Sequence, residues 1–159
     1  MSDSFVNEKP ARRSFAAHYV LLGALVIGLY WFVNQRAESQ LEWLNDLDTA
    51  VARAQSKEIP VLLDFWADWC GPCLELDNRI FSSDAVASVA SKNYVPMRVD
   101  LSGKRPSRSH EEIAKHYGVE TIPTILVLDA VSRKVIARAS HDDEASPEAF
   151  VRFLKLHSR

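Results

Sequence analysis

The feature that most constrains this chain is the placement of its two cysteines. Cys70 and Cys73 directly follow an apolar run, residues 61–66, that is broken by a single carboxylate. Such a run is typical of a central strand that is buried on both faces. Pro72, between the cysteines, is well tolerated in the first turn of a helix, so a helix is expected from there to about residue 81. The pair therefore marks a turn from a buried strand into a helix.

This placement gives the cysteine pair a redox chemistry. Two intervening residues let the sulfur atoms close a small disulfide ring across one helical turn. Free amide groups at the start of a helix stabilise a thiolate on the first cysteine, Cys70, and lower its pKa. A thiol with a lowered pKa is both a nucleophile and a leaving group near neutral pH. Gly71 and Pro72 are expected to hold the ring geometry and to leave the sulfur of Cys70 uncovered.

Other uses of two cysteines fit the sequence less well. A structural zinc site needs four ligands, and neither a second Cys-x-x-Cys pair nor a nearby pair of histidines is present. Haem attachment needs a histidine after the second cysteine, where Leu74 stands. A Cys–His protease would leave Cys73 unexplained. An inert structural disulfide stays open, although the start of a helix behind Trp69 is an unusual place for one.

Beyond residue 40 the chain alternates between helical and strand patterns. Apolar residues at spacings of three and four indicate helices, and short β-rich runs indicate strands. Helices are expected from residue 41 to residue 57 or 58, from 71 or 72 to about 81, from 83 or 84, from Ser109 to about Tyr117, and from Pro147 after a Ser146 cap, with strands over residues 61–66, 94–101, 124–129 and 134–139. The last two strands are four residues apart, as in an antiparallel hairpin. This order suits an α/β fold in which helices cover both faces of a mixed sheet.

The N-terminal part has the charge pattern of a membrane anchor. Residues 15–33 are nineteen residues without Asp, Glu, Lys or Arg. In a helix they would reach roughly 28 Å, close to the hydrocarbon thickness of a bilayer. Lys9, Arg12 and Arg13 precede the run and Arg36 alone follows it closely, which predicts a cytoplasmic N-terminus.

The same pattern sets the expected domain boundaries. A cytoplasmic segment, residues 1–14, leads to a transmembrane signal-anchor helix, residues 15–34, and residues 35–159 form a folded domain on the other side. A cleaved signal peptide ends in a small-x-small site, whereas residues 31–35 here read Trp-Phe-Val-Asn-Gln. An uncleaved anchor is therefore favoured over a cleaved one.

The composition and length argue against nucleic-acid binding and against a second ordinary domain. Nineteen Lys and Arg against 21 Asp and Glu give a net charge of −2, without the positive excess with which nucleic-acid binders neutralise phosphates. With 159 residues the chain is long enough for one domain with a core and too short for two ordinary ones. Nucleic acid is therefore not an expected partner.

Two segments resemble the thioredoxin superfamily. Residues 63–73, Leu-Asp-Phe-Trp-Ala-Asp-Trp-Cys-Gly-Pro-Cys, are similar to the active-site strand and turn of that family. Residues 121–124, Thr-Ile-Pro-Thr, match the loop in which the family has a cis-proline facing the cysteines. Residues 67–82 are most similar to the C-terminal periplasmic domain of the transmembrane reductase DsbD, although the Gly-Pro turn is that of thioredoxin proper. The resemblance covers roughly residues 41–157 and implies a thioredoxin fold, a mixed central sheet flanked by helices.

The resemblance also implies roles for acidic and aromatic residues near the cysteines. Asp64 matches the internal carboxylate of the family, whose burial raises its pKa and which accepts the proton of Cys73. The alternative is a structural carboxylate held by backbone amides. Asp77 corresponds to an acidic position of the DsbD-like domains, and it is either a second proton acceptor or a surface charge. Trp69 and Trp66 are expected to shield the site.

The second segment of the resemblance implies a substrate-binding loop, made of Thr121, Ile122 and Pro123. A cis bond before Pro123 would bring the backbone of Ile122 beside Cys70, where an incoming peptide can pair with it. The alternative is an ordinary trans proline before a strand.

Together these expectations describe a thiol:disulfide oxidoreductase of the bacterial inner membrane, with one membrane pass and its catalytic domain in the periplasm. Its expected partners are protein or peptide disulfides, a membrane electron donor of the DsbD type, and the inner membrane through residues 15–34. Beyond the redox-active Cys70–Cys73 disulfide, neither a metal nor an organic cofactor is expected. Two alternatives stay open: a thiol reductase of cytochrome c maturation, and a thioredoxin-fold binding module without turnover. The sequence leaves the redox direction open, although the Gly-Pro turn favours reduction.

Overall fold

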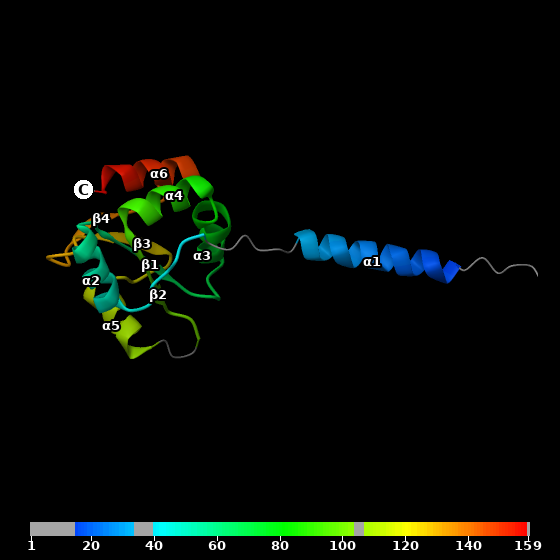
Figure 1. Ribbon diagram of the computed structural model, residues 1–159. Coiled ribbons are helices and arrows are strands. Elements are labelled where there is room, and N and C mark those ends of the chain that lie inside the picture. Colours follow the sequence, from blue (N-terminus) through cyan, green and yellow to red (C-terminus); the bar gives the residue numbers. More distant parts are fainter. Residues whose placement is uncertain (1–14, 34–39, 104–106, 159) are drawn as a thin grey trace, which may run out of the picture. The chain divides into compact units, whose positions relative to one another are not determined.

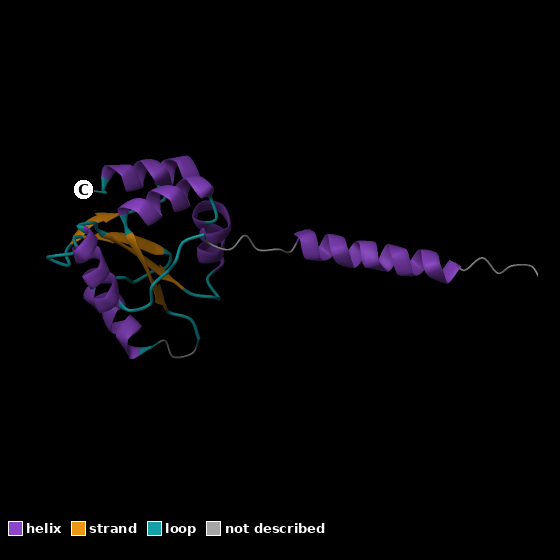
Figure 2. Ribbon diagram, viewed as in Figure 1, coloured by secondary structure: helices purple, strands orange, loops and turns teal. Residues whose placement is uncertain are grey.

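A computed structural model describes residues 15–33, 40–103 and 107–158 of the chain (Figure 1). The chain divides into two compact units, Met1–Arg36 and Ala37–Arg159. The second unit contains the strands and all the helices after the first one (Figure 2).

The first unit contains one described element, helix α1 (Phe15–Val33). The structure thus confirms a helix over the apolar run. Among the described residues, however, no helix is long and apolar enough to cross a membrane. The membrane span that the sequence predicts for residues 15–34 is therefore not confirmed, and the predicted cytoplasmic segment, residues 1–14, lies outside the described residues.

A four-stranded mixed sheet forms the centre of the second unit. Its strands lie in the order β2 (Val95–Asp100), β1 (Val61–Trp66), β3 (Thr124–Leu128) and β4 (Val135–Arg138). Strand β1 is parallel to β2 and antiparallel to β3, and β3 and β4 form the expected antiparallel hairpin. In this register Asp64 of β1 lies directly opposite Arg98 of β2.

Helices cover both faces of the sheet, as the sequence predicts (Figures 1 and 2). The helices on one face are α2 (Leu47–Lys57) and α5 (Arg108–His116), and those on the other are α3 (Gly71–Leu76), η1 (Asp77–Phe81), α4 (Asp84–Asn93) and α6 (Pro147–Leu156). Leu62 of β1 packs against the second group, whereas Leu63 and Phe65 pack against the first. Because side chains alternate along a strand, Asp64 faces the same side as Leu62. Its carboxylate therefore points toward the layer that contains α3 and η1.

The helix expected from residue 41 begins only at Leu47. Asp46 is its N-cap, since the Thr49 N–H donates to Asp46 Oδ1 over 2.8 Å. Leu44 lies instead beside β2, where its N–H donates to the Pro96 carbonyl over 3.0 Å and forms a parallel bridge to Met97. The apolar residues before residue 47 therefore belong to an extended segment, in which Leu41 is buried and Leu44 half-buried, and not to the first turn of the helix.

The sequence predicts Ser146 as the cap of α6 and Ser109 as the start of α5, and the structure confirms only the first of these. Ser146 caps α6, and its Oγ accepts from the Ala149 N–H over 3.2 Å. Gly118 follows α5 with a φ of 62°, the left-handed conformation that glycine adopts at helix ends. The cap at the start of α5 is Ser107 and not Ser109, because the Ser107 Oγ accepts from the His110 N–H over 3.2 Å.

Candidate active site

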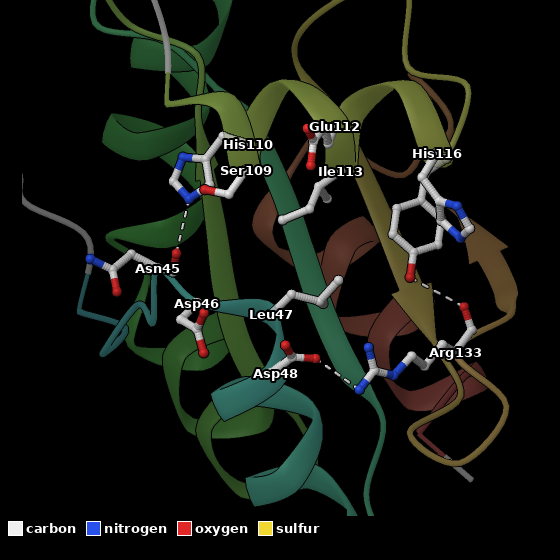
Figure 3. A pocket seen from close by; sticks show the side chains of 11 residues that line it. Asn45, Asp46, Leu47, Asp48, Ser109, His110, Glu112, Ile113, His116 and Arg133 are labelled. Carbon is white, nitrogen blue, oxygen red and sulfur yellow. Dashed lines mark hydrogen bonds and ion pairs between the residues drawn. The ribbon is translucent and has the colours of Figure 1, made fainter.

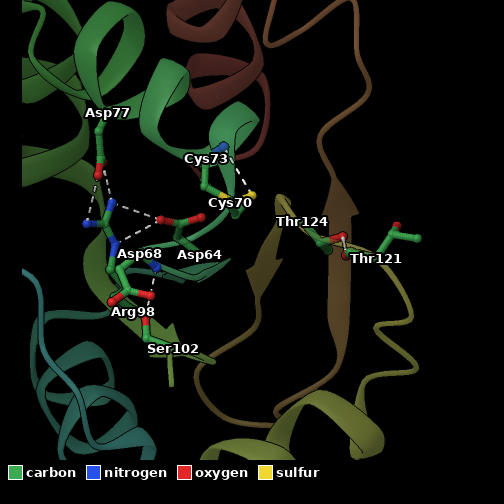
Figure 4. Close-up of a disulfide and its surroundings, with 9 residues drawn as sticks. All are labelled: Asp64, Asp68, Cys70, Cys73, Asp77, Arg98, Ser102, Thr121 and Thr124. Atoms are coloured by element: carbon green, nitrogen blue, oxygen red, sulfur yellow. Dashed lines mark hydrogen bonds and ion pairs between the residues drawn. A yellow bond between two sulfur atoms is a disulfide. The ribbon is translucent and has the colours of Figure 1, made fainter. Parts of the chain in front are cut away.

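The two cysteines form a disulfide at the start of α3 (Figure 4). Cys70 is the N-cap of this helix, and its Sγ accepts a hydrogen bond from the Cys73 N–H over 3.2 Å. Pro72 occupies the first turn, as expected. In the reduced protein the same amide would stabilise a thiolate on Cys70. The strand-to-helix turn therefore presents Cys70, rather than Cys73, to the helix amides.

Both cysteines are buried, although the sequence predicts an uncovered sulfur on Cys70. Cys70 is 5% exposed and Cys73 is 3% exposed. Around them pack the side chains of Trp66, Ala67, Leu101 and Ile122. The expected uncovered position of Cys70 is therefore wrong, because segments distant in sequence close around the pair. Trp66 packs against the cysteine pair, as expected of a shielding residue, whereas Trp69 is 66% exposed and is open to a partner.

The predicted substrate-binding loop lies beside the cysteines. The Ile122–Pro123 peptide bond is cis, and half-buried Ile122 packs against the cysteine pair. The Thr124 hydroxyl donates to the Thr121 carbonyl over 2.8 Å and closes the loop onto the start of β3 (Figure 4). The structure thus brings Ile122 to the place that the resemblance predicts.

A cavity of about 520 Å³ joins this loop to the active-site turn. Its lining comes from α3, η1, the loop and the segment before α6: Pro72, Glu75, Leu76, Arg79, Ile80, Pro123, Ala139, His141, Glu144 and Ala145. Charged groups of both signs stand on its wall, with Glu75 and Arg79 paired to each other. The cavity therefore offers polar and apolar contacts to a peptide beside the disulfide.

The sequence analysis missed two titratable residues of this cavity, His141 and Glu144. Glu144 is half-buried, and burial raises its pKa to about 7, helped by the negative charges of Asp64 and Asp143. Its sequence neighbours, Asp142 and Asp143, give the segment an acidic run. That run was the available signal, but only the fold shows that one member lies near the active site.

Asp64 is the buried carboxylate of the site. It is 2% exposed, and burial raises its pKa to about 6, against the opposing effect of the Arg98 charge and with a smaller raising effect from Asp77. The pKa is therefore raised in the direction that the resemblance implies. Its hydrogen bonds come from the Arg98 guanidinium (Figure 4), so a side chain is its partner.

Arg98 joins the two acidic residues, and the sequence analysis did not single it out. Its Nε donates to Asp64 Oδ2 over 2.9 Å, and its Nη2 donates to Asp77 Oδ1 over 2.6 Å. The guanidinium carbon lies over two indole rings, 4.4 Å from the Trp43 centroid and 4.7 Å from the Trp66 centroid. Asp77 is therefore part of a half-buried ion cluster and not a surface charge.

A second cavity, of about 420 Å³, lies between the start of α2 and the length of α5, with Arg133 also in its lining (Figure 3). None of the predicted site residues lines it. Asp48 pairs with Arg133 over 2.9 Å, and His110 Nε2 lies 2.9 Å from the Asn45 carbonyl oxygen. Within the described residues, no group of three or more His, Cys, Asp or Glu side chains could hold a metal ion. Of the predicted site residues, Pro72 and Pro123 line the cavity beside the disulfide instead.

Comparison with known proteins identifies the family. The family model described as thioredoxin-like matches residues 42–130, more than half of the chain. The chain belongs to the thioredoxin-like family. This assignment agrees with the fold and with the cysteine turn at the end of β1.

The curated relatives include thiol:disulfide interchange proteins named DsbD. The protein from Cronobacter sakazakii is 33% identical over 146 residues, which cover 83% of this chain and 25% of the relative. The protein from Klebsiella pneumoniae is 39% identical over 85 residues, which cover 54% of this chain and 13% of the relative. The chain thus spans about a quarter or less of the length of these relatives.

Solved structures share the fold. A DsbH oxidoreductase has a TM-score of 0.64 at 22% identity, with 79% of this chain and 89% of that one covered. The oxidised C-terminal domain of Neisseria meningitidis DsbD has a TM-score of 0.58 at 20% identity, with 72% of this chain and 98% of that one covered. The resemblance to the C-terminal domain of DsbD is therefore confirmed.

Proposed function

We propose that this chain reduces protein or peptide disulfides through a dithiol formed by Cys70 and Cys73. The observation that carries this proposal is the disulfide at the start of α3, beside the cavity that Pro72 and Pro123 share. The relatives named as thiol:disulfide interchange proteins support the same chemistry. The Gly71-Pro72 turn, which resembles that of thioredoxin, favours the reducing direction.

The reaction has two exchange steps. In the first step the Cys70 thiolate attacks one sulfur of the substrate disulfide, whose S–S bond breaks. The other substrate sulfur leaves as a thiolate and takes a proton from water, and Cys70 is left in a mixed disulfide.

In the second step the Cys73 thiol gives its proton to Asp64, and the resulting thiolate attacks the Cys70 sulfur. The bond between Cys70 and the substrate breaks, and the Cys70–Cys73 disulfide forms. The second substrate sulfur leaves as a thiolate and takes a proton from water, and Asp64 releases its proton to water. Two electrons have then passed from the enzyme to the substrate.

The oxidised enzyme needs two electrons for another cycle. A membrane electron donor of the DsbD type would supply them by the reverse exchange at Cys70. Trp69, which is 66% exposed next to the disulfide, offers an apolar contact to both the donor and the substrate.

We further propose that residues 15–34 anchor the chain in a bacterial inner membrane and leave residues 35–159 in the periplasm. The support is the charge-free run of residues 15–33 and the basic residues that precede it. A reporter that is active only outside the cytoplasm, fused after Arg159, should be active and membrane-bound. A soluble reporter would show that the anchor is cleaved, and a silent one that the orientation is wrong.

The redox potential of the Cys70–Cys73 pair tests the reducing direction. The full chain is equilibrated in glutathione buffers, and its dithiol fraction is measured after acid quenching and thiol alkylation. Members of the superfamily range from about −270 mV for thioredoxin to about −120 mV for DsbA. A reductase is expected near the lower end, and a potential above about −150 mV would favour an oxidase or isomerase.

A turnover assay separates an enzyme from a binding module. The reduced full chain should release thiols from a peptide disulfide, and the Cys70→Ser variant should release none. Binding of the peptide without release of thiols by the natural chain would show a module without turnover.

A further inference from the structure

Arg98 lies at the centre of an ion cluster that the reaction steps above do not use. Its side chain is 14% exposed, and it contacts Asp64, which is 3% exposed, and Asp77, which is 18% exposed. We propose that Arg98 is a positioning residue for the second exchange step, holding one oxygen of Asp64 and leaving the other to accept the proton of Cys73. This inference rests on the proposed function.

Arg98 contacts only one of the two oxygens of the Asp64 carboxylate. Arg98 Nε and Nη2 both lie 2.9 Å from the same oxygen, Oδ2. The other oxygen, Oδ1, takes part in neither contact. In Figure 4 it points away from Arg98, to the side of the carboxylate on which Cys70 and Cys73 lie. Arg98 thus orients the carboxylate without occupying the oxygen that faces the cysteines.

Asp77 and two indole rings hold the guanidinium in this orientation. Asp77 accepts from Nη2 over 2.6 Å and from Nη1 over 3.3 Å. Trp43 and Trp66 stack on the guanidinium at 4.4 and 4.7 Å from their ring centroids. A planar group with several N–H donors can make these contacts together, whereas a lysine ammonium cannot. Arginine is therefore needed at this position for one side chain to contact Asp64, Asp77 and the two indole rings at the same time.

The charges around Asp64 predict opposite effects of removing each partner. Arg98 faces Asp64 from β2, Asp77 from η1, and Glu144 from the segment before α6. Burial raises the pKa of Asp64 to about 6, the Arg98 charge lowers it, and the Asp77 charge raises it. Losing Arg98 should therefore raise the pH at which Asp64 ionises by about one to three pH units. Losing the charge of Asp77 should lower that pH.

An infrared titration of the oxidised full chain measures this ionisation without any turnover. The absorption of the protonated Asp64 carboxyl is identified by its loss in Asp64→Asn. Relative to the natural chain, Arg98→Met should titrate at higher pH and Asp77→Asn at lower pH. Arg53→Met is the matched control, because it removes an exposed cation of α2 and should leave the midpoint unchanged.

A kinetic measurement connects the ionisation to the second exchange step. Acid quenching and mass spectrometry monitor the resolution of the mixed disulfide at pH values between about 5 and 9, a range that contains the expected midpoints. In Arg98→Met the midpoint of the resolution rate should move upward together with the infrared midpoint. The Arg98→Lys variant keeps the positive charge, so its midpoint should lie closer to that of the natural chain than the midpoint of Arg98→Met does. It lacks the planar guanidinium, so at high pH it should resolve the mixed disulfide more slowly than the natural chain. Formation of the mixed disulfide should change little in both variants.

The possible outcomes separate this proposal from the proposed function. Opposite infrared shifts in Arg98→Met and Asp77→Asn, with a parallel shift in the rate profile, support the positioning role. Equal midpoints in the natural chain and both variants overturn it, whether or not the chain is active. If Arg98→Met does not fold, an unchanged or raised midpoint in Asp77→Asn overturns it as well. Failure of the natural chain to reduce any disulfide overturns the proposed function instead.

Discussion

Replacing Asp64 by Asn should stabilise the protein at neutral pH. The carboxylate is 2% exposed, and burial raises its pKa from the ordinary 3.8 to about 6. The difference is about two pH units, and each unit corresponds to about 1.4 kcal/mol. Ionised Asp64 therefore costs the folded state on the order of 3 kcal/mol at pH 7. Asn keeps an oxygen that can accept from Arg98 and removes the charge, so most of this cost should disappear.

The gain should depend on pH in a definite direction. Between pH 3.8 and about 6 the folded protein holds a proton on Asp64 that the unfolded chain has lost. The contribution of Asp64 to the free energy of unfolding therefore falls as the pH rises through this window, and it is constant above it. The difference between Asp64→Asn and the natural chain should be small near pH 3.5, grow up to about pH 7, and stay constant beyond.

Urea unfolding of the oxidised full chain, followed by tryptophan fluorescence at several pH values, measures this difference. In thermal unfolding the same gain corresponds to an increase of about 10 °C in Tm at pH 7. A variant that is less stable at pH 7, or a difference that does not vary with pH, would show that ionised Asp64 does not destabilise the fold and is a structural carboxylate.

The same substitution should slow catalysis at one step only. Without the proton acceptor, resolution of the mixed disulfide by Cys73 should be about 10 to 100 times slower. Formation of the mixed disulfide by Cys70 should hardly change. Stopped-flow traces with a peptide disulfide separate the two steps, and an unchanged resolution rate would exclude Asp64 as the base.

Two further substitutions test side chains around the disulfide, Trp69 and Glu144. Trp69→Ala removes an exposed aromatic ring beside the disulfide, so it should raise KM for a peptide disulfide by about 3 to 10 times and leave kcat nearly unchanged; steady-state kinetics would contradict this if only kcat fell. Burial raises the pKa of Glu144 above its ordinary 4.5, to about 7, so its contribution to stability falls as the pH rises between these values. Glu144→Gln should therefore be more stable than the natural chain at pH 8 but not at pH 4. The gain in stability should be smaller than that of Asp64→Asn, because Glu144 is only half-buried. Equal gains at both pH values in urea unfolding would refute this prediction.

The local features of the fold could be predicted because short-range chemistry determines them. The apolar run of β1, the proline-containing turn after it and the Ser146 cap of α6 each depend on a few neighbouring residues. The start of α2 could not be predicted in the same way. Residues 41–44 have helical spacing, but backbone pairing of Leu44 with β2 holds them extended, and the sequence gives no sign of that partner.

In the candidate active site, too, contacts between residues distant in sequence could not be predicted. The cysteines, Asp64 and the cis-proline loop could be predicted from motifs, but their surroundings could not. Arg98 is 34 residues from Asp64 in sequence and meets it through the parallel register of β1 and β2. Glu144 reaches the cavity because α6 packs against the α3 side of the sheet. The available signal for the Asp64–Arg98 pair was the single acidic residue of β1 and the single basic residue of β2.

In the proposed reaction Cys70 attacks the substrate and Cys73 resolves the mixed disulfide. Burial does not distinguish the two cysteines, which are 5% and 3% exposed, but only Cys70 receives the amide hydrogen bond at the helix start. Cys73→Ser and Cys70→Ser variants of the full chain are each incubated with a peptide disulfide and analysed by mass spectrometry without reductant. Cys73→Ser should accumulate the mixed disulfide on Cys70, and Cys70→Ser should accumulate none. Equal trapping by both variants, or trapping by Cys70→Ser alone, would contradict these roles of the two cysteines.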